Sequence, residues 1–169
     1  MVKNLWAPWR MSYLQCKDEQ CDDCIFCVAD KSDEDEERMV LHRGRLAFVM
    51  MNKFPYTNGH LLIVPYRHIA DISDIADQEM LEMHQLLKLS HTVLDRYCQP
   101  QGFNVGMNIG RIAGAGIADH LHLHLVPRWV GDTNFMPVFA EVRVIPQHLQ
   151  ETYRLLSQCF LHLQKDNQK

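Results

Sequence analysis

Three histidines occur at alternate positions in the segment HLHLHLV, residues 120–126. Successive side chains of a β-strand point to opposite faces, so His120, His122 and His124 would share one face and the leucines between them the other. A helix would scatter the imidazoles, whereas leucine at every second position is typical of a half-buried strand. The pattern predicts a strand with an apolar face in a core and an imidazole face directed at something else.

Three explanations fit such a face. The imidazoles could line a solvated surface, although exposed strand faces more often carry Lys, Thr or Glu. They could bind a metal, but the outer two of the three positions lie about 13 Å apart along a strand, too far for one ion to use all three easily. A neutral imidazole, with an ordinary pKa of about 6.5, can also attack phosphorus or a carbonyl carbon. We therefore expect the three histidines to have different functions.

Four of the six cysteines lie in one short segment, CKDEQCDDCIFC, residues 16–27. In a reducing compartment this spacing favours metal or redox chemistry over disulfides. The pair Cys24 and Cys27 encloses two apolar residues, Ile25 and Phe26, that could dock into a core. The pair could therefore be a metal site or a reduced core motif, and the two remaining cysteines of the segment could be exposed thiols or rival ligands.

The overall composition limits the possible partners. The chain has 169 residues, enough for one domain with a substantial core, and its formal net charge is −4. This charge argues against broad binding to nucleic acid but permits a small phosphate ligand. No segment resembles a signal peptide or a membrane span, so we expect no membrane association and a cytoplasmic location.

The elements that must position these residues follow from periodicity and turn signals. Apolar runs at 46–52 and 60–66 flank a turn with Pro and Gly, as in an antiparallel hairpin. Helical periodicity begins at Asp77, a plausible N-cap, and continues to residue 98. Further strands are expected at 102–110, 120–126 and 138–144, a helix that opens at Pro146, and a solvated acidic loop at 30–37. Strands, helix, strands and helix predict an α+β fold with a mainly antiparallel sheet.

Two motifs together resemble a known family. HLHLHLVP is similar to the signature strand of the histidine triad (HIT) family, and FVMMNKFPYTNGHLLIVP (48–65) is similar to its second hallmark. The resemblance covers about residues 48–128. It implies a single HIT-like domain over 1–169: an N-terminal extension (1–45) with the cysteine cluster and acidic loop, a catalytic core (46–128), and a C-terminal strand and helix (129–169). It also implies an antiparallel sheet with a long central helix and a C-terminal helix, and a homodimer with a continuous sheet.

The same resemblance implies a reaction and its residues. Family members transfer a nucleotidyl group through a nucleotidyl-histidine, and His122 matches the nucleophile. His124 would bind the phosphate region, His60 would support the site, and Asn52 would bind the ribose. Asn108 matches a position near the phosphates.

One departure from the family concerns the leaving group. Many family hydrolases place Gln followed by Ser or Thr shortly before the triad, where this chain has Gly116, Ile117 and Ala118. Backbone N–H groups could substitute for the missing side chains, with Gly116 and Ile117 as the expected substrate-binding residues. The segments PWR, CIFC and DHLHLHLVPRWVGDTNF more loosely resemble bacterial members that look like diadenosine-tetraphosphate phosphorylases, in which phosphate replaces water as acceptor.

The resemblance also implies a metal site. Several bacterial members carry zinc on a Cys-x-x-Cys pair, a mid-chain histidine and the first triad histidine, which match Cys24, Cys27, His68 and His120. Four protein ligands with no open position make a structural zinc. This assignment leaves His122 free to react.

The sequence therefore supports one leading hypothesis and two rivals. The leading hypothesis is a nucleotidyl transferase or hydrolase acting on adenine nucleotides or dinucleoside polyphosphates, with water or phosphate as acceptor. The first rival is a zinc-stabilised nucleotide-binding or sensing module with little turnover. The second is a histidine-based metalloenzyme.

Overall fold

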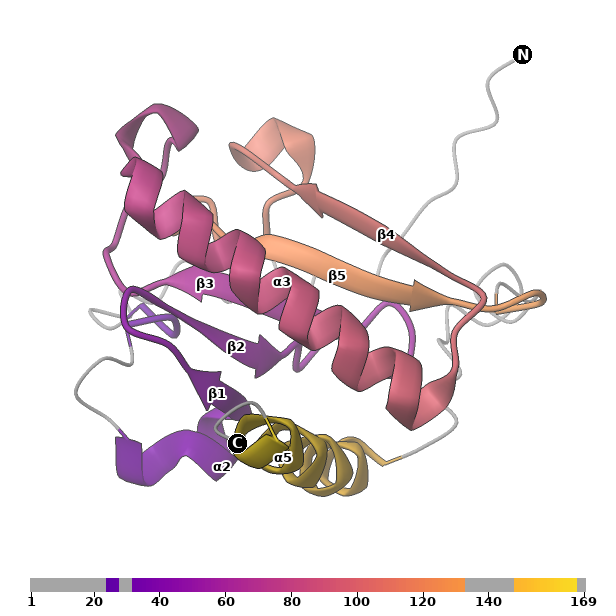
Figure 1. Cartoon of the computed structure of the whole chain (residues 1–169). Coiled ribbons are helices and arrows are strands. Elements are labelled where there is room, and N and C mark those ends of the chain that lie inside the picture. The colour runs from indigo at the N-terminus through magenta and orange to yellow at the C-terminus, as the bar shows by residue number, and fades with distance from the viewer. Residues whose placement is uncertain (1–23, 28–31, 133–147, 167–169) are drawn as a thin grey trace, which may run out of the picture.

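Five antiparallel strands of the described residues form one sheet in the order β1-β2-β3-β5-β4 (Figure 1). The computed structural model describes residues 24–27, 32–132 and 148–166. The strands are β1 (Val40–Arg43), β2 (Ala47–Met51), β3 (Leu61–Pro65), β4 (Gly102–Met107) and β5 (Leu123–Arg128). The expected hairpin at 46–52 and 60–66 is confirmed by the pairing of β2 with β3.

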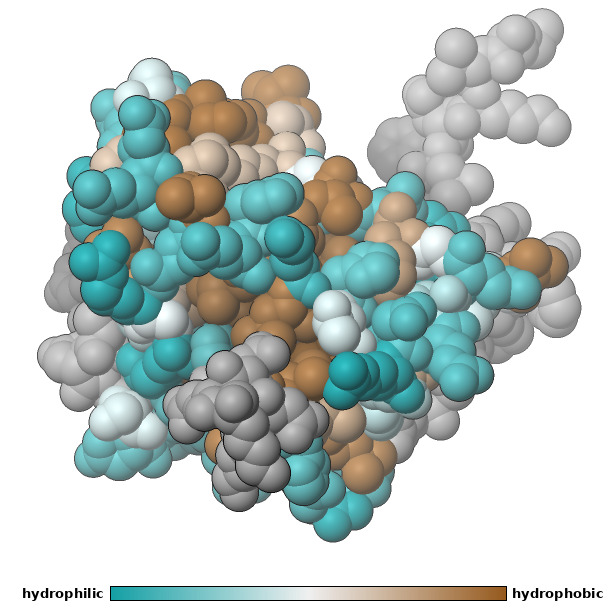
Figure 2. Space-filling view, in the orientation of Figure 1, coloured by the Kyte–Doolittle hydropathy of each residue, from teal (hydrophilic) through white to brown (hydrophobic). Residues whose placement is uncertain are grey.

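Two helices cover one face of this sheet. The long central helix α3 (Asp77–Cys98) runs diagonally across β2 and β3, and the C-terminal helix α5 (Leu149–Asp166) packs on α3 and β1 (Figure 1). The outer surface of α3 is mostly hydrophilic, as the space-filling view shows (Figure 2). The main core lies between these helices and the sheet and includes Val49, Ile63, Met83, Leu94 and Phe160.

The opposite face of the sheet carries a second apolar cluster. Because side chains alternate along a strand, Phe48 and Met50 of β2 and Leu62 and Val64 of β3 point away from the helices. Phe26, from the segment between the two cysteines, packs into the same cluster. Strands β2 and β3 are thus buried on both faces, which explains why their sequences are continuously apolar rather than alternating.

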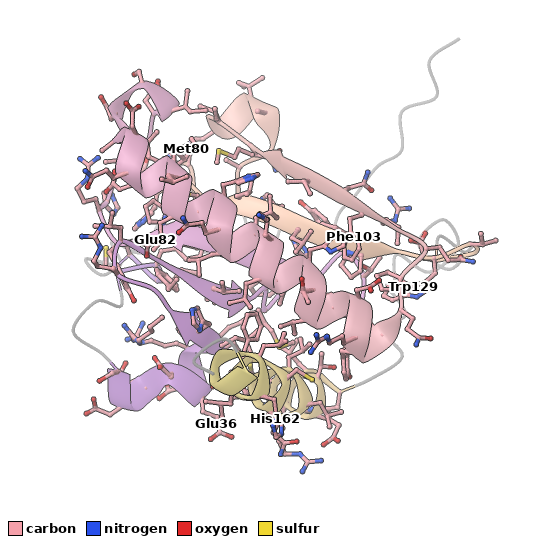
Figure 3. The ribbon with its side chains drawn as sticks, in the orientation of Figure 1. Glu36, Met80, Glu82, Phe103, Trp129 and His162 are labelled. Carbon is pink, nitrogen blue, oxygen red and sulfur yellow. The ribbon has the colours of Figure 1, made fainter. Side chains whose placement is uncertain are left out.

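A carboxylate ties the central helix to the sheet. Glu82 Oε1 accepts hydrogen bonds from the backbone N–H groups of Leu46 (2.8 Å) and Ala47 (3.3 Å), in the turn before β2 (Figure 3). These interactions satisfy two backbone N–H groups at the point where the chain turns from β1 into β2. They also fix where α3 crosses the sheet.

The start of α3 differs from the sequence prediction. Ala76, not Asp77, is the N-cap, and Asp77 is the first helical residue. The Glu79 carboxylate accepts from the Ala76 backbone N–H (2.9 Å) and also pairs with the Arg67 guanidinium (2.6 Å), which holds the pKa of Glu79 below its usual value. A carboxylate three residues inside the helix therefore replaces the expected cap.

Two other predictions need correction. The acidic run 30–37 is not a plain loop, because its described part forms the 3-10 helix η1 (Ser32–Glu34) and the short helix α2 (Asp35–Arg38). Strand β1 was not predicted at all. The expected strand 138–144 and Pro146 lie outside the described residues, and α5 begins at Leu149.

The α+β class, the antiparallel sheet, the central helix and the C-terminal helix are confirmed. Among the described residues, no helix is long and apolar enough to span a membrane. The division of the chain into extension, core and C-terminal part stays a prediction.

Candidate active site

The histidine segment is only partly a strand. β5 begins at Leu123, so His120, which lies in a bend, and His122 precede it without a ladder partner, and the predicted strand start at residue 120 is wrong. His124 lies within β5, opposite Leu62 of β3 and Gly106 of β4. This register places its side chain on the sheet face that carries the second apolar cluster, away from the helices.

His122 is held in one tautomer by the main chain. Its Nδ1–H donates to the carbonyl oxygen of His120 (2.8 Å), because a carbonyl can only accept. The other ring nitrogen, Nε2, then carries a lone pair, and it has no hydrogen-bond partner within residues 24–27, 32–132 and 148–166. The side chain is only 5% exposed, and this burial lowers the pKa of His122, which keeps the ring neutral at physiological pH.

A chain of hydrogen bonds fixes the opposite tautomer in His124. The backbone N–H of Tyr56 donates to His60 Nδ1 (3.1 Å), so the proton of a neutral His60 is on Nε2. That Nε2–H donates to His124 Nδ1 (2.9 Å) and leaves the His124 proton on its own Nε2. This last N–H is buried and has no partner among the described residues. A buried donor without an acceptor is expected to receive one from a ligand.

Burial also sets the charge of this second imidazole. Desolvation, helped by the neighbouring His122, lowers the pKa of His124 to about 4. The site at neutral pH therefore presents a lone pair on His122 beside an N–H donor on His124, with ring centroids 4.8 Å apart. A nucleophile next to a hydrogen-bond donor suits attack on a group that becomes more negative during the reaction.

The turn before β3 delivers His60 to this position. Gly59 has φ +75°, and a Cβ on it would lie 3.1 Å from Leu94 Cδ2, so glycine suits both the turn and the packing on α3. His60 itself is fully buried. Both of its ring nitrogens have partners within the protein, with Nε2 directed at His124, and its expected supporting function stays a prediction.

Asn52 closes β2 beside the same turn. Its Nδ2 lies 3.3 Å from His60 Nδ1, and its Oδ1 accepts from the Phe54 backbone N–H (2.8 Å). In this arrangement Asn52 orients the turn and His60. Its expected contact with a ribose stays a prediction.

The four expected metal ligands come together. The donor atoms of Cys24, Cys27, His68 and His120 all lie within 4.8 Å of one another. His120 Nδ1 is 3.3 Å from Cys24 Sγ and 4.0 Å from Cys27 Sγ, and His68 Nδ1 is 3.5 Å from Cys27 Sγ. Tetrahedral zinc bonded to sulfur and nitrogen at its usual bond lengths would set such sulfur–nitrogen edges at about 3.6 Å.

Two further observations fit a metal. His120 Nε2–H donates to the carbonyl oxygen of Pro65 (2.9 Å), which leaves Nδ1 unprotonated and directed at the two sulfurs. Burial raises the pKa of the Cys24 thiol to about 11. A cation would supply the charge needed to hold a thiolate there, so the donor set fits a soft divalent ion.

Phe26 belongs to the site and was missed by the sequence analysis. It is 2% exposed and contacts the rings of both His120 and His122, whereas Ile25 beside it is 49% exposed. Of the two residues that the sequence offered for a core, only Phe26 is buried. The spacing of the cysteines predicted a loop, but not which of its two apolar side chains would turn inward.

The remaining predicted substrate ligands lie at the end of β4 and in the connection that leads to His120. Asn108 follows the end of β4, where Met107 pairs with Leu123, and it is half-buried. Gly116 and Ile117 are half-buried in the connection that leads to His120, and Ile117 packs on the second apolar cluster. Their binding functions stay predictions.

A protein with this sheet and this cluster of histidines can be compared with known families. The family model described as "HIT domain" matches residues 33–130. The chain therefore belongs to the histidine triad (HIT) family, and the resemblance found in the sequence is confirmed.

Individual proteins of known name or structure are similar to this chain. The chain is 39% identical over 162 residues to a Mycobacterium tuberculosis protein named AP-4-A phosphorylase, covering 92% of this chain and 83% of the relative. It is 30% identical over 105 residues to the adenosine 5'-monophosphoramidase of Schizosaccharomyces pombe, covering 62% and 74%. Among solved structures, a Zn-bound histidine triad protein from Mycobacterium smegmatis shares the fold with a TM-score of 0.67 at 24% identity, covering 86% of this chain and 98% of the other.

Proposed function

We propose that this protein transfers a nucleotidyl group from an adenine nucleotide or dinucleoside polyphosphate through a covalent intermediate on His122. The observation that carries the proposal is the pair of opposite tautomers. Within the described part of the chain, the Nε2 lone pair of His122 and the Nε2–H of the adjacent His124 have no hydrogen-bond partner. Membership of the HIT family supports the same chemistry.

The reaction has two displacements at one phosphorus. In the first, the Nε2 lone pair of His122 forms a bond to the α-phosphorus, and the bond from that phosphorus to the oxygen of the leaving phosphate breaks. The Nε2–H of His124 donates to a phosphoryl oxygen as its charge grows. In the second, an oxygen of water or phosphate bonds to the phosphorus, the P–N bond breaks, and the lone pair returns to His122. With water as acceptor one proton is released.

The relatives suggest the substrate class. Their names refer to a diadenosine polyphosphate and to an adenosine monophosphoramidate, which share an adenylyl group. We propose that Asn52 reaches the ribose, and that Asn108 with the backbone of Gly116 and Ile117 binds the phosphates. Because the last two offer no side-chain donor, the leaving phosphate would be stabilised by backbone N–H groups.

The nucleophile can be tested directly. The protein is mixed with diadenosine tetraphosphate and quenched in denaturant, and its intact mass is measured by mass spectrometry. The wild type should carry one adenylyl group and His122→Ala none. His84→Ala, which alters an exposed histidine on α3, should keep the adduct. An adduct on His122→Ala would show that another residue attacks.

Product analysis then separates the remaining alternatives. Attack on an α-phosphorus of diadenosine tetraphosphate releases ATP. Water as acceptor then gives AMP, whereas phosphate gives ADP. Repeated turnover would exclude the nucleotide-sensing alternative, and a single adduct without release would favour it.

We further propose that Cys24, Cys27, His68 and His120 bind one structural zinc ion. The support is their donor geometry and, at the level of fold, the Zn-bound structural relative. With four protein ligands the ion would have no position for water, so it would hold the N-terminal segment rather than take part in the reaction. A reduced, cytoplasmic protein would keep both thiols available, and metal analysis of the purified chain tests the site.

We also propose a homodimer that joins two sheets at β4. The other outer strand, β1, is flanked by α2 and α5, whereas β4 exposes Val105 (51%) on an edge that pairs with no other strand of the described residues. Light scattering should give twice the chain mass for the wild type and a lower mass for Val105→Lys. Val130→Lys, at an exposed valine outside the strands, should remain dimeric. A monomeric wild type would refute the proposal.

A further inference from the structure

The loop between Cys24 and Cys27 directs one side chain at the histidine that carries the free lone pair. The ring of Phe26 lies 4.9 Å from the ring of His122, with 50° between their planes, and 5.5 Å from the ring of His120. Ile25, the neighbouring residue of the same loop, faces solvent. The contact is therefore specific to one of the two enclosed residues.

A contact of this kind restricts the orientation of the His122 imidazole ring. The χ2 torsion of histidine has broad minima, and a single hydrogen bond, from Nδ1 to the His120 carbonyl, leaves the ring free to rock about that bond. Phe26 packs against the ring at 4.9 Å, and His124 lies at 4.8 Å with its plane at 63°. Contacts with these two neighbours oppose that rocking.

Phe26 is in turn held by its own surroundings. The Cys27 backbone N–H donates to the Cys24 carbonyl (3.0 Å), which closes the turn that carries Phe26. The ring is 2% exposed and packs into the second apolar cluster with Val40 and Phe48. The position of Phe26 therefore depends on the cysteine loop on one side and on the sheet on the other.

We propose that Phe26 is a positioning residue that keeps His122 Nε2 aimed at the substrate phosphorus and so connects the cysteine loop to the reaction. The inference rests on the proposed function of His122. Its physical basis is that a nucleophile displaced by about 1 Å can lose roughly 100-fold in rate while substrate binding is unaffected. Phe26 acts on catalysis only through the imidazole.

Three variants test this role. Phe26→Ala removes the contact, Phe26→Leu keeps bulk without the aromatic ring, and Ile25→Ala alters the same loop on its exposed side. We expect kcat with diadenosine tetraphosphate to fall about 10- to 100-fold in Phe26→Ala, with KM within about twofold, and to fall less in Phe26→Leu. Ile25→Ala should keep both parameters.

Two measurements separate positioning from general damage. The first is the NMR signal of the His122 ring Cε1–H in the absence of nucleotide, assigned with His122→Ala. It should shift in both Phe26 variants, because the aromatic ring current is lost, and stay in place in Ile25→Ala. The second is zinc content and melting temperature, which we expect to remain near wild type in Phe26→Leu. If Phe26→Ala does not fold, Phe26→Leu decides the test.

Three results would overturn the proposal. They are an unchanged kcat in a folded Phe26 variant, an equal loss in Ile25→Ala, or a loss that follows zinc content across the variants. Failure of the proposed function is distinguishable, because the wild type would then form no adenylyl adduct while the NMR signal would still report the contact of Phe26 with His122.

Discussion

The hydrogen bond from His60 to His124 allows a quantitative prediction. In His60→Phe, the Nε2–H donor that reaches His124 Nδ1 at 2.9 Å is lost, and a buried acceptor is left unpaired. Loss of an ordinary hydrogen bond changes a free energy by about 0.5–1.5 kcal/mol, whereas an unsatisfied buried group costs about 1–3 kcal/mol. His124 would also be free to place its proton on Nδ1, which removes the donor from the phosphate. Removal of one donor from an oxyanion site costs about 100- to 1,000-fold in kcat.

The expected result lies between these limits. We expect kcat of His60→Phe to fall about 10- to 100-fold, or roughly 1.4–2.7 kcal/mol, with KM little changed because His60 is fully buried. Stopped-flow release of ATP from diadenosine tetraphosphate measures this step. His60→Gln, whose amide can donate to His124, should recover part of the rate. A kcat of His60→Phe within twofold of wild type would refute the role of the relay.

Two further predictions concern stability. Burial lowers the pKa of His124 to about 4, below its unfolded value of about 6.5, so the unfolded chain binds more protons between these pH values. The free energy of unfolding should therefore decrease as pH falls from 6.5 to 4, and it should decrease less in His124→Gln. Urea titrations at pH 7 and pH 5 measure this free energy for both chains. An equal decrease in the wild type and the variant would contradict the assignment. Cys27→Ser should lose bound zinc and melt at lower temperature, whereas Cys159→Ser, which alters a thiol on α5 outside the cluster, should do neither. Calorimetry with metal analysis checks both, and zinc retained by Cys27→Ser would show that another residue completes the site.

The elements with strong periodicity could be predicted from the sequence. β2, β3 and α3 follow from runs of apolar residues whose spacing is set by the local backbone. The cluster of Cys24, Cys27, His68 and His120 was predicted from a family resemblance, because no spacing rule connects Cys24 with His120, 96 positions away. Its geometry in the structure agrees with that prediction.

The errors have identifiable physical causes. Alternation over 120–126 reports an extended backbone, but a strand also needs a partner, and β4 pairs only as far as Leu123. Charge in the acidic run suggested full solvation, yet Asp35 pairs with Arg43 of β1 (2.7 Å). The cap of α3 depends on Glu79, whose carboxylate is fixed by Arg67 from another segment. Each of these outcomes depends on tertiary contacts that local sequence does not report.

Backbone groups determine which nitrogen of each imidazole in the site carries the proton. The amide of Tyr56 sets His60, and through it His124, while the carbonyl of His120 sets His122. Substitution of a side chain leaves an amide or carbonyl in place, unless proline replaces Tyr56. A change of side chain at residue 56 therefore leaves in place the amide that decides which nitrogen of His60 and of His124 carries the proton, so the acid–base pattern is a property of the turn itself.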